Sequence, residues 1–259
     1  MGPQKLKNST LVKIFLRSFF IHSTLNFRKM QNLGFAMAVI PAVREWNLSP
    51  KDTERILTRH LQMFNTHPYF SASVIGAVVR LEEEQVYGDN MSADAVVVKQ
   101  SLMGPYAAIG DTFFWGALRP CAAIIAIILG WLGIIIAPLV FLLIYTPVHF
   151  WVRMKGFIEG YRKGKQGIEF IRIMDLPRFA VRLRWIFLVM LSLFAVLLTV
   201  KEKLPSIHLP GAVINLGALA IILFCFMLIK RRISQFYILY GAFVIFILIS
   251  MKEVISWWK

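Results

Sequence analysis

A lone carboxylate, Asp111, stands in a stretch of sequence that repeatedly interrupts a helix. Residues 102–120 read LMGPYAAIGDTFFWGALRP and hold the helix-breaking residues Gly104, Pro105 and Gly110. The stretch directly precedes a long apolar run, and irregular backbone at membrane depth is tolerated only where it lines protein or a water-filled cavity. The pattern therefore predicts a re-entrant hairpin that does not face lipid.

Two roles fit Asp111. A carboxylate at membrane depth is costly unless it is paired or hydrated, so Asp111 is a candidate functional residue, with Arg119 as its nearest basic partner in sequence. Alternatively, Asp111 caps the following helix by accepting hydrogen bonds from the backbone amides of Phe113 or Phe114. The two roles can coexist, and the sequence leaves both open.

A second polar group lies in the motif FNTHP. Asn65, Thr66 and His67 place an amide, a hydroxyl and an imidazole directly before Pro68. Such a group can hydrogen-bond sugar hydroxyls or close the loop on itself, and the side-chain chemistry favours the turn. No adjacent carboxylate or glycine-rich phosphate cradle accompanies His67, so this histidine is not expected to carry a phosphoryl group.

Other reactive residue types give no catalytic pattern. The three carboxylates of LEEEQ, residues 82–84, predict a solvated or interfacial helix face rather than a metal site, because further ligands are not obvious. Cys121 and Cys225 lie in apolar segments without metal-like spacing, and we expect both to be lipid-buried rather than paired. We find no Ser-His-Asp order, Walker-type glycine loop or cysteine nucleophile setting, so neither a cofactor nor catalysis by this chain alone is expected.

The elements that position these residues belong to a membrane protein. Of the 259 residues 58% are hydrophobic and 17% are charged, with 29 Lys and Arg against 14 Asp and Glu. Positive charge collects between the long apolar runs, whereas a nucleic-acid binder would interleave the two. Residues 1–10 lack the apolar core of a secretory signal, so internal segments are expected to direct insertion. The expected fold is an all-α integral membrane protein in a lipid bilayer, without a nucleic-acid partner.

About four hydrophobic membrane helices are expected. The run 121–152 carries no charged side chain and exceeds the roughly 20 residues that cross a bilayer, so it is tilted or broken, with a break between Gly130 and Pro138. Three shorter apolar segments follow at 185–200, 211–229 and 236–251. Their short connections predict antiparallel neighbours.

Charge sets the expected orientation and the regions of the chain. Lys and Arg far outnumber acidic residues in 153–184, which places this basic connection in the cytoplasm and the C-terminus in the periplasm. The predicted regions are an amphipathic and re-entrant part (1–120), a long membrane helix (121–152), the basic connection (153–184) and three C-terminal membrane helices (185–259). Within the first part, Ser49 begins an amphipathic helix over 50–64 that either lies at the membrane face, which its basic side favours, or packs on a protein core.

Several of these motifs resemble the IID subunit of the mannose family of the bacterial sugar phosphotransferase system. They occur in the family's order between residue 14 and about residue 170, and they read FLRSFF, NFRKMQNLGFAMAVIPAVR, RHLQMFNTHPYF, LEEE, SLMGPYAAIGDTFFWGALRP and GYRKG. The resemblance implies a noncatalytic inner-membrane subunit that pairs with a IIC subunit to form the sugar-translocating unit, with IIC–IID pairs gathered in a higher oligomer. Separate IIA and IIB phosphocarriers would pass phosphate from phosphoenolpyruvate to a hexose or amino sugar as it enters the cytoplasm.

The resemblance also implies functional residues and an elevator-like movement of a sugar-holding core. Carried over by motif, Gln31 of NFRKMQ, Asn65 and His67 of FNTHP, and Asp111 with Trp115 of GDTFFWG are expected to line the translocation path near the IIC subunit.

The sequence departs from the family in two places, and two other classes remain open. Thr112 and Phe113 stand where the family commonly has Pro-Ile, and the last hydrophobic segments are joined by a shorter connection. A scaffold or regulator that has lost transport would keep the fold without supporting uptake. An enzyme acting on lipid or polyprenyl substrates would need an interfacial catalytic cluster, for which only Asp111 and the LEEE run are candidates.

Overall fold

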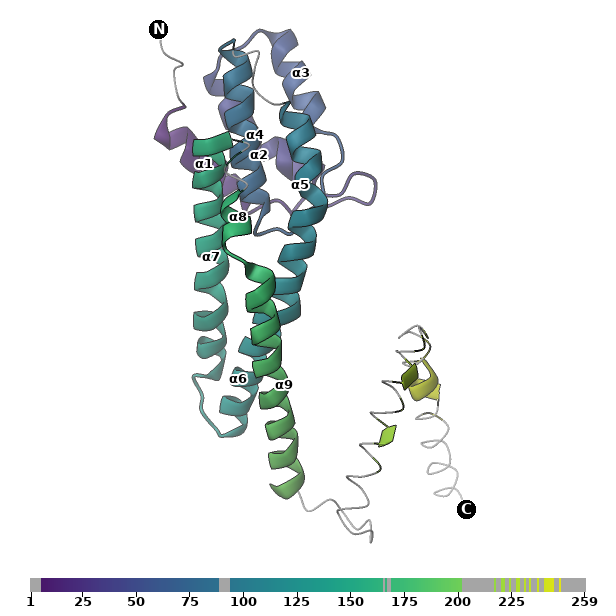
Figure 1. Cartoon of the computed structure of the whole chain (residues 1–259). Helices are drawn as coiled ribbons and strands as arrows, with labels where there is room; N and C mark the ends of the chain where they lie inside the picture. Colours follow the sequence, from purple (N-terminus) through teal and green to yellow (C-terminus); the bar gives the residue numbers. More distant parts are fainter. Residues whose placement is uncertain are drawn as a thin grey trace, which may run out of the picture. The chain divides into compact units, whose positions relative to one another are not determined.

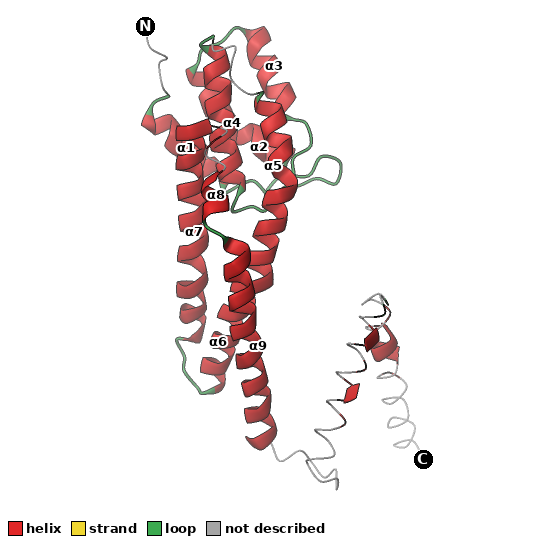
Figure 2. Ribbon diagram, viewed as in Figure 1, coloured by secondary structure: helices red, strands yellow, loops and turns green. Residues whose placement is uncertain are grey.

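The computed structural model describes residues 6–88, 94–164, 166 and 169–201, together with scattered positions between 217 and 247. The chain divides into two compact units, Met1–Leu198 and Thr199–Lys259, and the residues discussed below belong to the first. The described part is built from helices, with isolated bridges but no strand, so the predicted all-α fold is confirmed (Figures 1 and 2). The helices are α1 (Asn8–Ser18), α2 (Asn32–Glu45), α3 (Pro50–His60), α4 (Ser71–Val86), α5 (Ala95–Gly110), the π-helix η1 (Asp111–Leu118), α6 (Arg119–Trp131), α7 (Ala137–Lys163), α8 (Glu169–Ile173) and α9 (Leu176–Lys201).

Among the described residues, three helical stretches are long and apolar enough to cross a membrane. They are Ala95–Trp131, Ala137–Lys163 and Ile171–Leu198. The first has 37 residues, so at 1.5 Å per residue it is about 55 Å long and exceeds the roughly 30 Å of bilayer hydrocarbon. One end of this rod must therefore project beyond the apolar layer, and α1 to α4 gather around that end (Figure 1).

The stretch that was expected to form a re-entrant hairpin is instead part of this continuous rod. Helix α5 passes through Gly104 and Pro105, and η1 and α6 follow without a turn. A bilayer offers no solvent for free backbone groups, so one lost proline hydrogen bond costs less than reversing the chain there. The prediction failed because it treated each helix-breaking residue as a turn.

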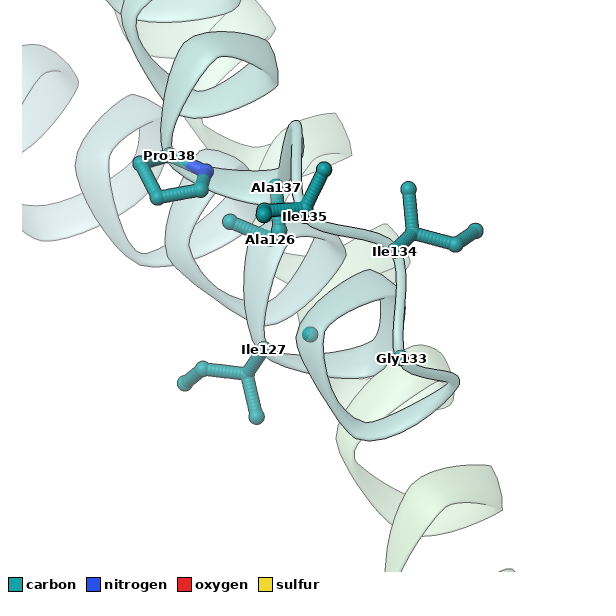
Figure 3. Close-up of a pocket in the computed structure, with 8 residues that line it drawn as sticks. Ala126, Ile127, Gly133, Ile134, Ile135, Ala137 and Pro138 are labelled. Atoms are coloured by element: carbon teal, nitrogen blue, oxygen red, sulfur yellow. The ribbon is translucent and has the colours of Figure 1, made fainter.

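The long apolar run 121–152 is two antiparallel helices rather than a single one. Helix α6 ends at Trp131, the chain turns through a left-handed Gly133 (φ 80°), and α7 begins at Ala137. The turn lies inside the segment where a break was expected. The hollow of about 560 Å³ at this turn is lined by glycine, alanine, isoleucine and Pro138, as Figure 3 shows, and therefore offers a polar solute no side chain to bind.

Helices α4 and α7 pack so closely that their backbones touch. A Cβ added at Gly76 of α4 would lie 2.5 Å from the carbonyl oxygen of Phe157, and one at Gly160 of α7 would lie 2.4 Å from that of Ser73. Small residues at such contacts let helices approach in the absence of a hydrophobic drive between them. Because α7 continues to Lys163, residues 153–163 of the expected basic connection belong to this packed helix, and only the short α8 separates it from α9.

Helix α3 begins directly after Ser49, where the sequence predicted a helix start. Ser49 accepts a hydrogen bond from the amide of Asp52 at 3.1 Å, as its position before Pro50 suggested. The apolar side of α3 packs on protein, with Ile56 and His60 buried, so the core-packed alternative describes this face.

The first of the three expected C-terminal membrane helices, 185–200, lies within α9. The structure does not describe most of the other two segments, 211–229 and 236–251, or the connection 202–210.

Candidate functional site

The candidate site is organised by Gln31, which holds the FNTHP turn. The Gln31 side chain accepts from the amide of Thr66 at 3.0 Å and donates to the carbonyl of the same residue at 2.7 Å. Its backbone amide also donates to the carbonyl oxygen of Phe64 at 2.8 Å. The amide side chain of Gln31 thus joins the NFRKMQ motif to the FNTHP motif, more than thirty positions further along the chain. Gln31 is 1% exposed.

His67, next in the turn, lies buried in an aromatic cage. Its ring stacks on Phe114 with centroids 5.1 Å apart and planes 16° apart, and Trp115 lies 4.8 Å away. Nδ1 accepts from the amide of Tyr69 at 3.3 Å, while Nε2 has no hydrogen-bond partner. Burial, reinforced by the nearby charges of His22 and Arg153, lowers the pKa of His67 to about 3, so the imidazole is neutral at physiological pH.

Gly110 is needed for close approach rather than for breaking a helix. A Cβ at this position would lie 2.3 Å from both Cβ and Cγ of His67. Around Gly104, in contrast, an added Cβ would meet no atom within 4 Å. The two glycines of the motif therefore differ: one admits the histidine ring, and the other lies on an open face of α5.

A second aromatic layer, which the sequence did not suggest, continues from the cage to α7. The ring of Tyr69 stacks on His149 at 4.4 Å, and its hydroxyl lies 3.1 Å from that of Tyr145. Arg153, 4% exposed, donates to the carbonyl oxygens of Pro68 at 2.9 Å and Ser18 at 3.1 Å. This arginine ties the turn to the end of α1; it is a structural cation inside the protein rather than part of a basic loop.

Asp111 and its neighbours lie on an outer face of the rod. Asp111, Trp115, Arg119 and Asn65 are exposed, whereas the caged His67 lies directly behind them. Asp111 forms no ion pair with Arg119 or any other described residue. It also caps no helix, because the chain is helical on both sides of it and η1 has no side-chain cap. The capping alternative is therefore wrong, and an unpaired carboxylate faces outward from a candidate membrane span.

The π-helix η1 carries this face and is braced by a residue that sequence reasoning missed. Arg184 of α9 donates from Nε to the carbonyl oxygen of Gly116 at 3.2 Å and from Nη2 to that of Thr112 at 3.4 Å. A Cβ at Gly116 would lie 3.1 Å from Nη2, so the glycine leaves room for the guanidinium. Wider π-turns often occur at functional sites, and they turn successive side chains differently from an α-helix. Arg184 thus fixes the segment that presents Asp111 and Trp115.

Two carboxylates of the LEEE run are buried, contrary to the solvated or interfacial face expected for it, whereas the Glu84 side chain is 25% exposed. Glu82 is 0% and Glu83 1% exposed. Glu82 pairs with Arg59 and lies 2.7 Å from Nε2 of His60. Glu83 accepts from the amide of Leu6 at 2.8 Å and from the hydroxyl of Tyr161 at 2.9 Å. The two carboxylates therefore join α4 to α3 on one side and to α7 and the segment before α1 on the other.

Neither the acidic run nor the cage resembles a metal centre. Across the described ranges, no group of three or more His, Cys, Asp or Glu side chains is arranged to hold a metal ion. The cage instead consists of rings packed on the buried imidazole of His67. The exposed side chains of Asp111 and Trp115 beside it are the groups that a polar solute could reach.

The fold and the site define an integral membrane protein of helical bundle type, in which polar residues on a spanning helix adjoin an aromatic cage. The chain belongs to the mannose/fructose/sorbose family of phosphotransferase-system IID components, whose sequence pattern matches residues 5–255. The resemblance that the motifs suggested is confirmed.

Individual relatives agree with this family. The chain is 36% identical over 165 residues to the mannose-specific EIID component of Escherichia coli K12, covering 62% of this chain and 58% of that protein. It is 31% identical over 167 residues to the fructose permease IID component of Bacillus subtilis 168, covering 64% and 61%. The matches thus span about three fifths of the length of these relatives.

Two solved structures share the fold over nearly the whole chain. One, described as the structure of a membrane protein, is 26% identical with a TM-score of 0.75 and covers 95% of this chain and 97% of its own. The other is a cryo-EM structure of the mannose transporter ManYZ in complex with microcin E492 (MceA). It is 27% identical with a TM-score of 0.58 and covers 95% and 96%.

Proposed function

We propose that this chain is the IID membrane subunit of a phosphoenolpyruvate-dependent sugar transporter and forms the translocation unit with a IIC subunit. The observation that carries the proposal is the exposed Asp111 on a candidate membrane span, because a carboxylate in that position needs a partner protein or water. Membership of the IID family and likeness to the mannose transporter ManYZ support the same assignment. IIA and IIB phosphocarriers would complete the system, and the chain itself would perform no phosphoryl transfer.

Within that unit, we assign Asp111, Trp115 and Asn65 to the face that meets the sugar path or the IIC subunit. Their side chains lie on the outside of the described bundle. Gln31 and His67 are buried behind this face, so their role is to hold the turn and the aromatic wall in place. The proposal thus separates residues that could reach a solute from residues that position them.

The experiment is uptake by cells that lack their own mannose-type system and receive this chain with its IIC, IIA and IIB partners. Uptake of labelled hexose should require phosphoenolpyruvate and should disappear when the IID gene is omitted. Asp111→Asn should abolish uptake while the IIC–IID complex still purifies intact, because the variant changes a charge on the surface and no described hydrogen bond. Glu54→Gln, which changes an exposed carboxylate on α3 that forms no ion pair with any other described residue, is the matched control and should leave uptake unchanged.

Other results would contradict the proposal. Uptake that is unaffected by deletion of the chain would indicate the scaffold or regulator instead. Loss of complex assembly in Asp111→Asn, in contrast, would be consistent with the proposal and would assign this carboxylate to the IIC interface rather than to the sugar path.

A further inference from the structure

The groove between α1 and α7 has the shape and polarity of a phospholipid site. It has a volume of about 500 Å³ and is lined by Leu11, Val12, Phe15, Met154, Phe157 and Ile158, with Asn8, Tyr161 and Arg162 at one end. The two helices meet across it through aromatic side chains, with the rings of Phe15 and Phe157 5.5 Å apart. The groove is therefore an apolar channel that ends in a cationic group.

An exposed apolar stripe on α1 lies beside this groove and continues past the end of the helix to Phe20. Val12, Leu16 and Phe20 follow one another at helical spacing and are 55%, 55% and 58% exposed. The same short helix carries Lys13 and Arg17, and a helix with an exposed apolar stripe and flanking basic residues lies in the membrane interface. An acyl chain in the groove would thus be continuous with the surrounding bilayer.

The charges at the end of α7 favour an anionic headgroup. Glu159 pairs with Lys163 at 2.8 Å and with Lys155 at 3.9 Å, whereas Arg162 forms no ion pair with any described residue. Arg162 alone among these cations lines the groove. The end of α7 also begins the basic segment that charge bias places on the cytoplasmic side, where anionic lipids attract basic residues.

We propose that the groove between α1 and α7 binds one anionic phospholipid, with an acyl chain along Val12, Phe15 and Phe157 and its phosphate at Arg162. The lipid fills the space between an interfacial helix and a spanning helix. The lipid thereby fixes the position of α1. The C-terminal end of this helix is joined to the FNTHP turn by Arg153. The assignment concerns lipid binding only and does not depend on whether the complex transports sugar.

The test is native mass spectrometry of the full chain, purified with any membrane partner that accompanies it. Dioleoylphosphatidylglycerol, dioleoylphosphatidylcholine and glycerol 3-phosphate are titrated separately. We expect one retained phosphatidylglycerol, weaker retention of phosphatidylcholine and no binding of glycerol 3-phosphate. Arg162→Gln should weaken phosphatidylglycerol binding about five-fold, because one basic residue near an anionic surface contributes about that factor to the affinity. The same variant should leave phosphatidylcholine binding unchanged. Lys163→Gln, which alters the neighbouring paired cation, should preserve the headgroup preference.

A second variant tests the apolar part. Val12→Trp fills the groove from an exposed position and should weaken both phospholipids while the protein remains folded. Three results would overturn the proposal: equal retention of the two phospholipids by the unaltered chain, equal losses in Arg162→Gln and Lys163→Gln, or binding of glycerol 3-phosphate alone. Loss of a co-purifying membrane subunit in Val12→Trp, with lipid binding unchanged, would assign the groove to that protein instead.

Discussion

The guanidinium of Arg184 lies 3.2 Å from the carbonyl oxygen of Gly116 and so joins α9 to the π-helix that carries Asp111. Charged donors strengthen hydrogen bonds to backbone carbonyls, and arginine can reach two acceptors at once. The register of η1 therefore depends on a residue more than sixty positions away in sequence.

Arg184→Gln should loosen η1 and lower sugar uptake several-fold while leaving the complex assembled. Hydrogen exchange should rise within residues 111–118, because two carbonyls lose their donor. Arg184→Lys should restore uptake in part, since an ammonium can reach one of the two oxygens. Arg182→Gln is the control on the same helix, because Arg182 lies over the ring of Phe179 and forms no hydrogen bond with the described residues of η1. Equal effects of the Arg182 and Arg184 variants would contradict this prediction.

Gly110→Ala should destabilise the protein by about 1–3 kcal/mol, the usual cost of overfilling a packed core. The new Cβ would overlap His67 and force its ring away from Phe114. Thermal unfolding in detergent measures the effect. Gly104→Ala introduces the same methyl group into open space and should not destabilise the protein. A similar loss of stability in both variants would show that the contact with His67 is not its cause, because alanine itself is favoured over glycine in a helix.

Glu83→Ala should cost about 3 kcal/mol of unfolding free energy, because it removes a buried carboxylate that accepts from Leu6 and Tyr161 and pairs with Arg80. Glu84→Ala removes the adjacent carboxylate, which is 25% exposed and pairs with Arg80, and should cost less than about 1 kcal/mol. Chemical denaturation of the two variants side by side gives the comparison. Equal losses would mean that the acidic run acts as a solvated face after all.

Acidification should destabilise the protein through His67. An unfolded histidine takes up a proton near pH 6.5, whereas the pKa of folded His67 is about 3, so the unfolded state binds more protons between these values. The stability associated with the neutral ring is complete above pH 6.5 and declines as pH falls toward 3. From pH 8 to pH 5 the loss is about 2 kcal/mol. His67→Gln should lack this part of the pH dependence; an unchanged pH profile would exclude His67 as the source.

The motifs selected Gln31 and His67 as residues of the translocation path, and that role stays a prediction. They did not predict that both residues lie buried at the FNTHP turn. Gly104 and Gly110 look alike in sequence, but only the surrounding tertiary structure shows that one faces open space and the other a histidine. The partners of Glu82 and Glu83 come from distant segments, so periodicity could not reveal that these carboxylates are buried. Sequence reasoning missed Arg184 because its hydrogen-bond acceptors, the carbonyl oxygens of Thr112 and Gly116, also lie in a distant segment.

The backbone contact between Gly160 and Ser73 has a consequence for biogenesis. Helix α4 leaves the ribosome well before α7, the helix with which it packs most extensively. The N-terminal third of the chain, which holds α1 to α4, therefore cannot complete its packing until α7 has been synthesised.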